Sequence, residues 1–553
     1  MIPLHVHSCY TLLQGAANIE MLVARAKQNR LEALALTDTN GMYGFVEFAK
    51  QAAEAGIKPI FGAYIDDEQN KNDYAVFLAR NIKGYEEVCK IITTKKLKPD
   101  FSLTRLLEAE FPNLFILINS VELLQKIPLR SNIFAELIAT KKKKASTRKL
   151  YEFVKEKGMR YVASNPVYFL DEDDFLLHKV VTAIRLRGAI ANLLPEDTVD
   201  EEYYFKDTAM LDELWKGLPE ALNSINYIAD NCNVDIGIGK YKFPVFTVPD
   251  NDSFSYLWSL CFDGLRQRYL RITDEIRKRL EYELSVINDL GLVDYFLVVW
   301  DIVREAKRRG MMMIGRGSAA NSIVSYCLGF TEVDPIRYKF YFERFLNRGR
   351  SSPPDIDIDF SWRERDEIIR YVFEKYGYDK VAMISTHITF RARSAFREVA
   401  KVFGMSESEV SKISKLIPWT SAKNLPKVAE LYPEAKSLDF KDEPWKSIVS
   451  IAARLSDYPR YIGIHPSGIV ISPKPITNFT ALEYAKNKGL GIIVTQPDMY
   501  GMEDMGLIKI DLLSQRALGV LRDTVKRIGA LKENTQQNRR AAIFNLAESL
   551  SVR

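Results

Sequence analysis

Residues 353–360, with the sequence PPDIDIDF, constrain the fold and the chemistry of this chain more than any other segment. The two prolines block a helix, and the residues that follow alternate carboxylate and apolar side chains, as in a β-strand with one buried face. In such a strand Asp355, Asp357 and Asp359 share the other face. Three neighbouring anions repel one another, so the pattern favours bound cations, and oxygen ligands suit Mg²⁺ or Mn²⁺. Because two such ions held about 3.5–4 Å apart support phosphoryl or nucleotidyl transfer, the segment predicts that chemistry.

A second strand, predicted at 506–513 (GLIKIDLL), supports the same site. It places Lys509 and Asp511 on one face and apolar side chains on the other. Asp511 would complete a three-carboxylate metal site, and Lys509 would balance its charge or hold a phosphate oxygen. The competing interpretation is that the aspartates belong to solvated turns, since Asp-x-Asp pairs are common on protein surfaces.

Length and composition indicate an ordinary multidomain protein. A chain of 553 residues predicts about three or four domains, and its 47 % hydrophobic and 27 % charged residues are typical of a soluble globular protein. The sequence shows neither a membrane-length apolar run nor a signal peptide, and its five cysteines are scattered. We therefore expect a cytoplasmic protein with reduced thiols and no membrane partner. The net charge of +5 permits a nucleic-acid partner without arguing for one.

The first 170 residues or so alternate strand-like and helix-like segments, which predicts a parallel sheet or a barrel of βα units. We predict strands at 32–38, 58–65, 74–80 and 113–119, a helix at 44–55, and a helix followed by a strand across 149–165. Near the N-terminus, His5 and His7 share one face of an extended segment, a spacing that suits a metal ion.

This N-terminal pattern resembles the PHP domain family, whose members bind metal ions through a ring of His, Asp and Glu residues on a distorted barrel. The resemblance implies a vestigial site with His5, His7 and Asp38 as its remnants. Other positions of the family pattern hold residues that do not match it: Gln14, Thr39, Tyr64, Pro166 and Tyr168. We therefore predict a PHP fold without hydrolytic activity, and a PHP phosphoesterase or 3′–5′ exonuclease is the disfavoured alternative.

From about residue 250 the pattern becomes helical. We predict helices at 273–292, 295–308, 363–375 and 389–404, a strand at 380–386, and a glycine turn followed by a strand within 460–472. A short apolar strand also runs into Gly315, Arg316, Gly317 and Ser318, where glycines let the backbone approach a ligand and Ser318 would cap a helix. This loop predicts a phosphate-binding site; a tight turn before a capped helix is the alternative, since the spacing matches neither of the common nucleotide-binding motifs.

A helix over 389–404 would align Arg393, Arg397 and Lys401 in one basic stripe. Together with Arg391 and His465, these residues are predicted to contact DNA, with the stripe binding backbone phosphates. A solvated surface is the alternative for the stripe.

The chain contains four motifs in a fixed order: GRGSAANS (315–322), ERFLNRGRSSPPDIDIDF (343–360), IGIHPSGIVIS (462–472) and TQPDMYGMEDMGLIKIDLL (495–513). Their order and spacing closely resemble the bacterial replicative C-family polymerases, the alpha subunits of DNA polymerase III. The resemblance implies that Asp357, Asp359 and Asp511 bind two catalytic metal ions, with Asp355 steering its neighbours or a metal-bound water. It also implies a catalytic role for Lys509 and places the glycine-serine loop by the incoming triphosphate.

We therefore predict an α/β multidomain chain, in which a PHP-type distorted βα barrel precedes a polymerase-beta-like nucleotidyltransferase palm with an inserted helical thumb. The predicted boundaries are 1–245 for the PHP domain, 246–397 for the first part of the palm, 398–457 for the thumb, 458–525 for the second part of the palm and 526–553 for a short atypical tail.

The activity implied by the resemblance is template-directed addition of dNTPs to a primer 3′-hydroxyl during DNA replication, with two Mg²⁺ ions (or Mn²⁺) as cofactors. Primer–template DNA and dNTPs are the implied partners. The family continues through fingers and further C-terminal regions that this sequence does not contain. We therefore expect a truncated product, or one part of a split enzyme that needs a separate fingers fragment or replisome proteins. A non-catalytic DNA-binding or assembly paralogue is the remaining alternative.

Overall fold

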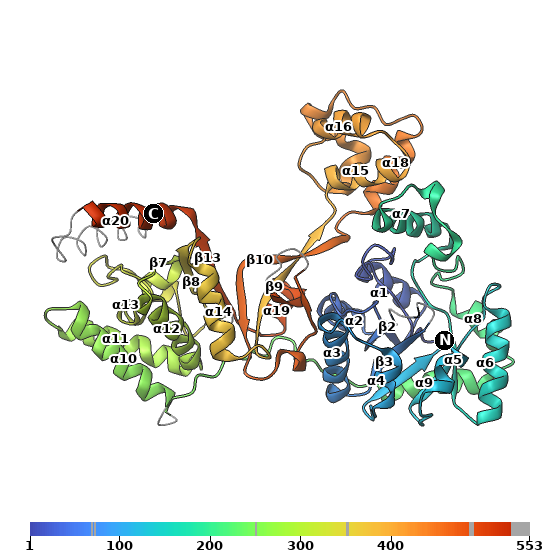
Figure 1. The fold of residues 1–553 in the computed structure, drawn as a ribbon, viewed down its shortest axis with the longest axis horizontal. Helices are drawn as coiled ribbons and strands as arrows, with labels where there is room; N and C mark the ends of the chain where they lie inside the picture. The colour runs from blue at the N-terminus through green and yellow to red at the C-terminus, as the bar shows by residue number, and fades with distance from the viewer. Residues whose placement is uncertain (68–69, 71–72, 249–251, 350–352, 486–490, 532–553) are drawn as a thin grey trace. The chain divides into compact units, whose positions relative to one another are not determined.

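The computed structural model describes residues 1–67, 70, 73–248, 252–349, 353–485 and 491–531, and its mixed α/β character confirms the predicted fold class. The chain forms two compact units, the first from residues 1–238, 385–463 and 477–501 and the second from 239–384, 464–476 and the described residues after 501. Strands β9 (Val381–Thr389) and β10 (Pro459–Ile471) each begin in one unit and end in the other (Figure 1).

The first unit contains a six-stranded sheet whose strands follow one another in sequence order. They are β1 (Ala33–Leu36), β2 (Lys58–Asp66), β3 (Tyr74–Ala79), β4 (Leu114–Ile118), β5 (Ile133–Ile138) and β6 (Tyr161–Ser164). β2–β3 and β3–β4 are antiparallel, and the other pairs are parallel. β1, β4, β5 and β6 are buried along their whole length, as expected of apolar strands covered on both faces. The predicted alternation of strands and helices is confirmed, but the expectation of parallel pairing fails at β3, which is antiparallel to both of its neighbours.

Helices fill the connections of this sheet. They are α1 (Ile19–Gln28), α2 (Phe45–Ala55), α3 (Ile82–Leu97), α4 (Leu103–Glu108), α5 (Val121–Lys126) and α6 (Lys144–Lys157), followed by α7 (Phe175–Leu186), α8 (Thr208–Trp215) and α9 (Pro219–Asn231). Side-chain oxygens of Asn18, Asn81, Ser102 and Ser120 cap α1, α3, α4 and α5, which explains where these helices begin.

The N-terminal segment joins the two edges of this sheet. On one side, Thr37 N donates to Val6 O at 2.8 Å, next to β1. On the other side, just beyond β6, His7 N donates to Val167 O at 2.8 Å and Val167 N donates to His5 O at 3.0 Å. Because this segment lies between both edges, its alternating side chains place His5 and His7 together inside the curled sheet.

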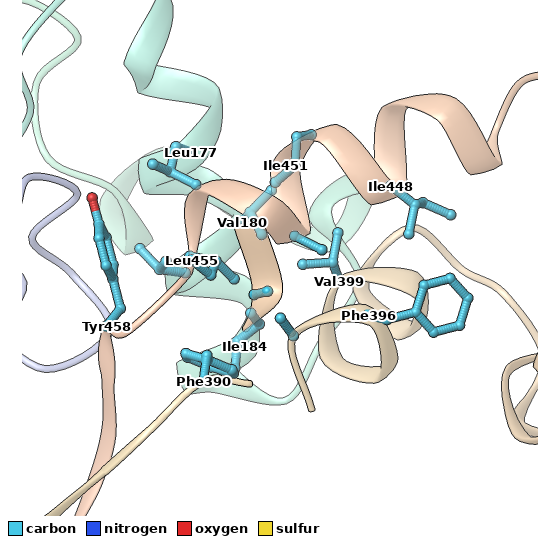
Figure 2. Close-up of a cluster of buried hydrophobic side chains, with 14 of the residues drawn as sticks. Leu177, Val180, Ile184, Phe390, Phe396, Val399, Ile448, Ile451, Leu455 and Tyr458 are labelled. Carbon is cyan, nitrogen blue, oxygen red and sulfur yellow. The ribbon is translucent and has the colours of Figure 1, made fainter. Parts of the chain in front are cut away.

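The segment predicted as the thumb also belongs to the first unit, with helices α15 (Ala392–Val402), α16 (Glu407–Leu416), α17 (Val428–Leu431) and α18 (Trp445–Arg454). These helices share one apolar cluster with α7. Figure 2 shows Leu177, Val180 and Ile184 of α7 facing Val399 of α15 and Ile451 of α18. Their spacing of three and four residues puts the three α7 side chains on one helical face, which explains the contact.

The second unit is built on a sheet in the order β10, β13 (Lys509–Gln515), β8 (Asp357–Ser361) and β7 (Met313–Arg316). β13 and β8 are parallel, while β10–β13 and β7–β8 are antiparallel. The helices of this unit are α10 (Ser253–Arg268), α11 (Asp274–Asp289), α12 (Val293–Arg308), α13 (Ile323–Leu328), α14 (Arg365–Tyr376) and α20 (Arg516–Leu531). The two short strands β11 (Leu482–Tyr484) and β12 (Ile493–Asp498) lie in the first unit, and α19 (Met499–Asp504) crosses between the units along the chain.

Three local predictions need correction or qualification. β8 begins at Asp357, so Asp355 precedes the strand that we expected to contain it. The glycine turn expected near His465 is absent, because β10 is continuous from Pro459 to Ile471. Arg365 Nη2 donates to Pro466 O at 2.6 Å, a hydrogen bond that supports this proline within the strand. Of the predicted tail, residues 526–531 end α20 and residues 532–553 lie outside the described part. Within the described ranges, we find no helix that could span a membrane.

Candidate active site

Strand register brings the predicted carboxylates together in the second unit. Asp357 on β8 lies opposite Asp511 on β13 and opposite Arg316 on β7. Asp359 lies two residues further along β8, on the same face as Asp357. Residues Ile356, Ile358 and Phe360 on the opposite face are fully buried, as the alternating pattern predicted. Because these apolar side chains pack into the core, the aspartates must lie on the other face of β8.

Asp359 is buried and paired with a single cation. Its Oδ2 lies 2.7 Å from Nε of Arg316, whose side chain is 43 % exposed. Its Oδ1 is also buried and has no hydrogen-bond partner in the described structure. Burial raises the pKa of Asp359 above its usual value, although the charge of Arg316 and hydrogen bonds from Arg316 and Gln515 act in the opposite direction. A buried carboxylate oxygen without a partner is costly for a folded protein, so this atom indicates a ligand site.

Asp511 is held by two neighbours. Ser467 Oγ donates to its Oδ1 at 2.7 Å, and Lys509 Nζ lies 2.9 Å from its Oδ2. Burial lowers the pKa of Lys509, but the hydrogen bond and the charge of Asp511 outweigh burial and raise it overall. Lys509 therefore remains a cation beside the aspartates. Ser467 was not among the predicted site residues, although its position two residues after His465 was a signal.

Asp357 experiences the excess negative charge of the site. Burial raises its pKa, and the charges of Asp511 and Asp355 raise it further, while Arg316 and Lys509 lower it. The carboxylates thus repel one another more than the two cations compensate. Such an arrangement is typical of a functional site, where more positive charge is needed.

The donor chemistry fits divalent metal ions, since all three aspartates offer carboxylate oxygens and one buried oxygen lacks a partner. In the described part of the chain, however, no three His, Cys, Asp or Glu side chains lie close enough together to hold an ion. Two of these carboxylates pair with cations instead, Asp359 with Arg316 and Asp511 with Lys509. The predicted metal ligands therefore stay a prediction.

The glycine loop begins within β7, which ends at Arg316. A Cβ on Gly315 would lie 2.1 Å from Phe330 O, so only glycine fits there, and Gly317 has a φ of +72° that favours glycine. A Cβ on Gly317 would lie 3.7 Å from Asp357 Oδ2, which puts the loop beside the carboxylates. The expectation that Ser318 caps the following helix is wrong. The residues after Arg316 form a 3₁₀ turn, and Ser322 caps α13 by accepting from Ser325 N.

Glu283 on α11 holds the residues that follow this loop. Its Oε2 accepts from Ser322 Oγ at 2.6 Å and from Val324 N at 3.2 Å. Arg279, paired with Glu283 at 2.6 Å, also donates to Asn321 O at 3.1 Å. Sequence reasoning missed Glu283, although an acidic residue three positions after Leu280, on the apolar face of a helix, was a signal.

A Glu283→Ala protein is expected to lose about 3 kcal/mol of unfolding free energy, because Arg279, Ser322 Oγ and Val324 N would lose their shared acceptor. Denaturant unfolding would measure the loss. Glu281→Ala, on the exposed side of the same helix, is the matched control and should change stability by less than about 0.5 kcal/mol. Equal stabilities for the two variants would contradict the role assigned to Glu283.

The basic residues predicted to contact DNA have partners within the protein. Arg393 Nη2 donates to Ile417 O at 2.7 Å, Lys401 Nζ lies 2.8 Å from Glu407, and Arg397 contacts the same glutamate. These contacts hold α15 against α16 and against the residue that follows α16. Arg391 lies 3.0 Å from Asp457, and His465 Nδ1 accepts from Gly468 N at 2.8 Å. Burial lowers the pKa of His465, which keeps this imidazole neutral at physiological pH. DNA contact by these residues stays a prediction.

The vestigial site of the first unit contains one residue that the sequence did not indicate. His5 Nδ1 lies 2.7 Å from Glu136 Oε1, and His5 Nε2 lies 2.9 Å from His7 Nε2. Glu136 also accepts from Ser164 Oγ and Tyr74 OH, each at 2.7 Å. Burial tends to raise the pKa of Glu136, but the charge and hydrogen bond of His5 outweigh it and lower the pKa overall. An acidic residue inside the apolar strand 133–138 was the available signal.

Asp38 lies next to this cluster but is bonded elsewhere. It accepts from Ser8 N at 2.7 Å, from Ser8 Oγ at 2.8 Å and from Thr11 Oγ1 at 2.7 Å. Burial raises the pKa of Asp38 to about 6 and lowers the pKa of His7 well below its usual value. The polar groups of this region satisfy one another, so its described residues hold no metal-binding group either.

Comparison with known proteins agrees with this geometry. Residues 255–514 match the family described as the bacterial DNA polymerase III alpha NTPase domain, and residues 3–163 match the PHP domain family. The error-prone DNA polymerase of Symbiobacterium thermophilum is 34 % identical over 598 residues, which cover 100 % of this chain and 55 % of the relative. The DNA polymerase III subunit alpha of Bacillus subtilis is 33 % identical over 547 residues, covering 94 % of this chain and 49 % of the relative. The subunit alpha of Escherichia coli is 32 % identical over 561 residues, covering 94 % and 48 %. The chain thus spans about half the length of these relatives.

Proposed function

The chain belongs to the family of bacterial DNA polymerase III alpha subunits, and from this premise we propose that it takes part in template-directed addition of deoxynucleotides to a primer 3′-hydroxyl during DNA replication. The proposed substrates are primer–template DNA and dNTPs, and the proposed location is the cytoplasm. Residues 357, 359 and 511 are the proposed metal ligands, and Lys509 is the proposed catalytic cation.

One observation carries this proposal. Two neighbouring parallel strands set Asp357 opposite Asp511, on the same sheet face as Asp359 and Lys509. This arrangement lies within the segment that matches the polymerase family. A solvated turn would leave these carboxylates exposed, whereas Asp359 is 3 % exposed and Asp511 is 9 % exposed.

Membership of this family suggests dependence on divalent metal ions, and we propose two Mg²⁺ ions, with Mn²⁺ as a substitute. When bound, such ions lower the pKa of the primer hydroxyl and neutralise charge on the triphosphate. The protein groups have separate tasks. Ser467 orients Asp511 through its hydrogen bond, and Lys509 provides a fixed cation for phosphate oxygens. Gly317 lets the backbone come close to the triphosphate, and Arg316 offers it a guanidinium.

The alternatives receive less support. A PHP phosphoesterase or exonuclease needs free metal ligands, whereas His5, His7 and Glu136 are hydrogen-bonded to one another. A purely DNA-binding paralogue needs no buried carboxylates beside a glycine loop. Because the chain covers about half of each relative cited above, we also propose that full activity involves a fingers fragment or replisome proteins.

The test is dNTP incorporation on a primed template with Mg²⁺ or Mn²⁺, by the chain alone and with an added fingers fragment. We expect incorporation that the double substitution Asp357→Asn, Asp359→Asn abolishes. The same double variant should release no phosphate or 3′ nucleotides, since the PHP site is predicted to be inactive. Incorporation that survives both substitutions would refute the assignment, and robust release by the variant would favour the phosphoesterase.

A further inference from the structure

We propose that Arg316 is an exchangeable counter-ion: it neutralises Asp359 before substrate binds, and the triphosphate of the incoming nucleotide draws it away so that Asp359 becomes available to a divalent ion. This inference rests on the function proposed above and adds a regulatory step to that site. It assigns Arg316 a role in coupling nucleotide binding to metal binding.

The contact itself is the first argument. Arg316 Nε lies 2.7 Å from Oδ2 of Asp359, and the other oxygen of this carboxylate is buried without a hydrogen-bond partner in the described structure. An ionised carboxylate that is almost fully buried needs a positive partner, because leaving it unpaired would cost several kcal/mol in general. A metal ion and Arg316 therefore compete for the same carboxylate.

The mobility that the exchange requires is the second argument. The side chain of Asp359 is 4 % exposed, whereas that of Arg316 is 43 % exposed, so the guanidinium reaches the buried acid from the solvent side. Arg316 can therefore change rotamer without disturbing the packed core.

Charge balance is the third argument. Asp357 lies opposite Asp511 on the neighbouring strand and shares a face with Asp359, so three carboxylates share the site with the two cations Arg316 and Lys509. Replacing the single charge of Arg316 by a divalent ion improves this balance. The displaced guanidinium needs a new anion, and arginine binds phosphate oxygens with two parallel hydrogen bonds. A triphosphate beside the glycine loop meets this need.

The experiment measures Mn²⁺ binding to the full chain without nucleotide, from the electron paramagnetic resonance signal of free Mn²⁺. We expect Arg316→Ala to bind Mn²⁺ about tenfold more tightly than wild type, since a competing cation is lost, and Arg316→Lys to stay near wild type. Without divalent ions, a fluorescent dNTP should bind Arg316→Ala about tenfold more weakly. Arg304→Ala is the matched control, because Arg304 is half exposed and pairs with the buried Asp301 away from the carboxylates. Arg304→Ala should change neither the affinity for Mn²⁺ nor the affinity for the fluorescent dNTP.

Two failures can be told apart. If Asp359→Asn leaves Mn²⁺ binding unchanged in both the wild-type and the Arg316→Ala background, the proposed metal site is wrong. If Asp359→Asn weakens binding but Arg316→Ala does not tighten it, the metal site stands and the exchange is refuted. Arg316→Gln repeats the comparison with a longer polar side chain in case Arg316→Ala fails to fold, which circular dichroism would reveal.

Discussion

An Asp511→Asn protein is expected to add nucleotides at least about 1,000-fold more slowly than wild type, while its unfolding free energy stays within about 1 kcal/mol. The loss follows if Asp511 is one of the three carboxylates that hold the ions. The small effect on stability follows from two opposing changes. The substitution removes repulsion from Asp357, whose pKa Asp511 raises, but it also removes the partner of Lys509. Ser467 Oγ can still donate to the oxygen of the new amide.

The measurement pairs primer extension with denaturant unfolding, in the presence of a fingers fragment if the chain alone is inactive. Asp523→Asn is the matched control, since the side chain of Asp523 on α20 is 41 % exposed and pairs with Arg363 at 3.2 Å. It should leave both quantities near wild type. An Asp511→Asn protein that retains more than a tenth of the wild-type rate would exclude Asp511 as a catalytic ligand.

Much of this site was predictable because its signals are local in sequence. The alternation in 353–360 and 506–513 predicted which side chains face the core, and Ile356, Ile358 and Phe360 are indeed fully buried. The start of β8 at Asp357 was not predictable. β8 begins where β13 and β7 offer hydrogen-bonding partners, and those partners lie far along the chain.

The groups that neutralise or orient the carboxylates could not be predicted in the same way. Arg316 on β7 reaches Asp359 on the neighbouring β8, Ser467 reaches Asp511 from β10, and Glu283 supports the loop from α11. No periodicity links these pairs. A sequence pattern predicts which face of a helix or strand a side chain lies on, but it does not predict which other element packs against that face. Only an acidic residue on an apolar surface, as at Glu283 or Glu136, gives a usable signal.

The fold was predictable element by element but not in its packing. The predicted alternation of strands and helices in the first 170 residues or so is confirmed, as are the helices that make up the segment 398–457. Nothing in the sequence indicated that α15 and α18 share a core with α7, more than 200 residues earlier in the chain. An apolar helical face predicts that the helix packs against another element, but it does not identify that element.

That shared core leads to the second prediction, for Phe396 of α15. Its side chain, labelled in Figure 2, is fully buried. Its ring lies 5.8 Å from that of Phe440 and 6.0 Å from that of Trp445. Phe396→Ala is expected to lower the unfolding free energy by about 3–5 kcal/mol, through lost burial and the cavity that remains. Because one apolar cluster joins α15 to α7, amide protection against hydrogen exchange should fall in both helices.

The control is Trp419→Ala, since Trp419 belongs to the same helical segment but is 89 % exposed; it should change stability by less than about 0.5 kcal/mol. Loss of protection in α15 and α18 with wild-type protection in α7 would show that α7 is stable without these helices. Loss in all three would mean that residues 175–186 support the helices of 392–454 as one cooperative unit. Such a role would rest on the apolar cluster and on the ion pair between Arg454 of α18 and Asp174 beside α7, and it does not involve the bonded cluster of His5, His7 and Glu136.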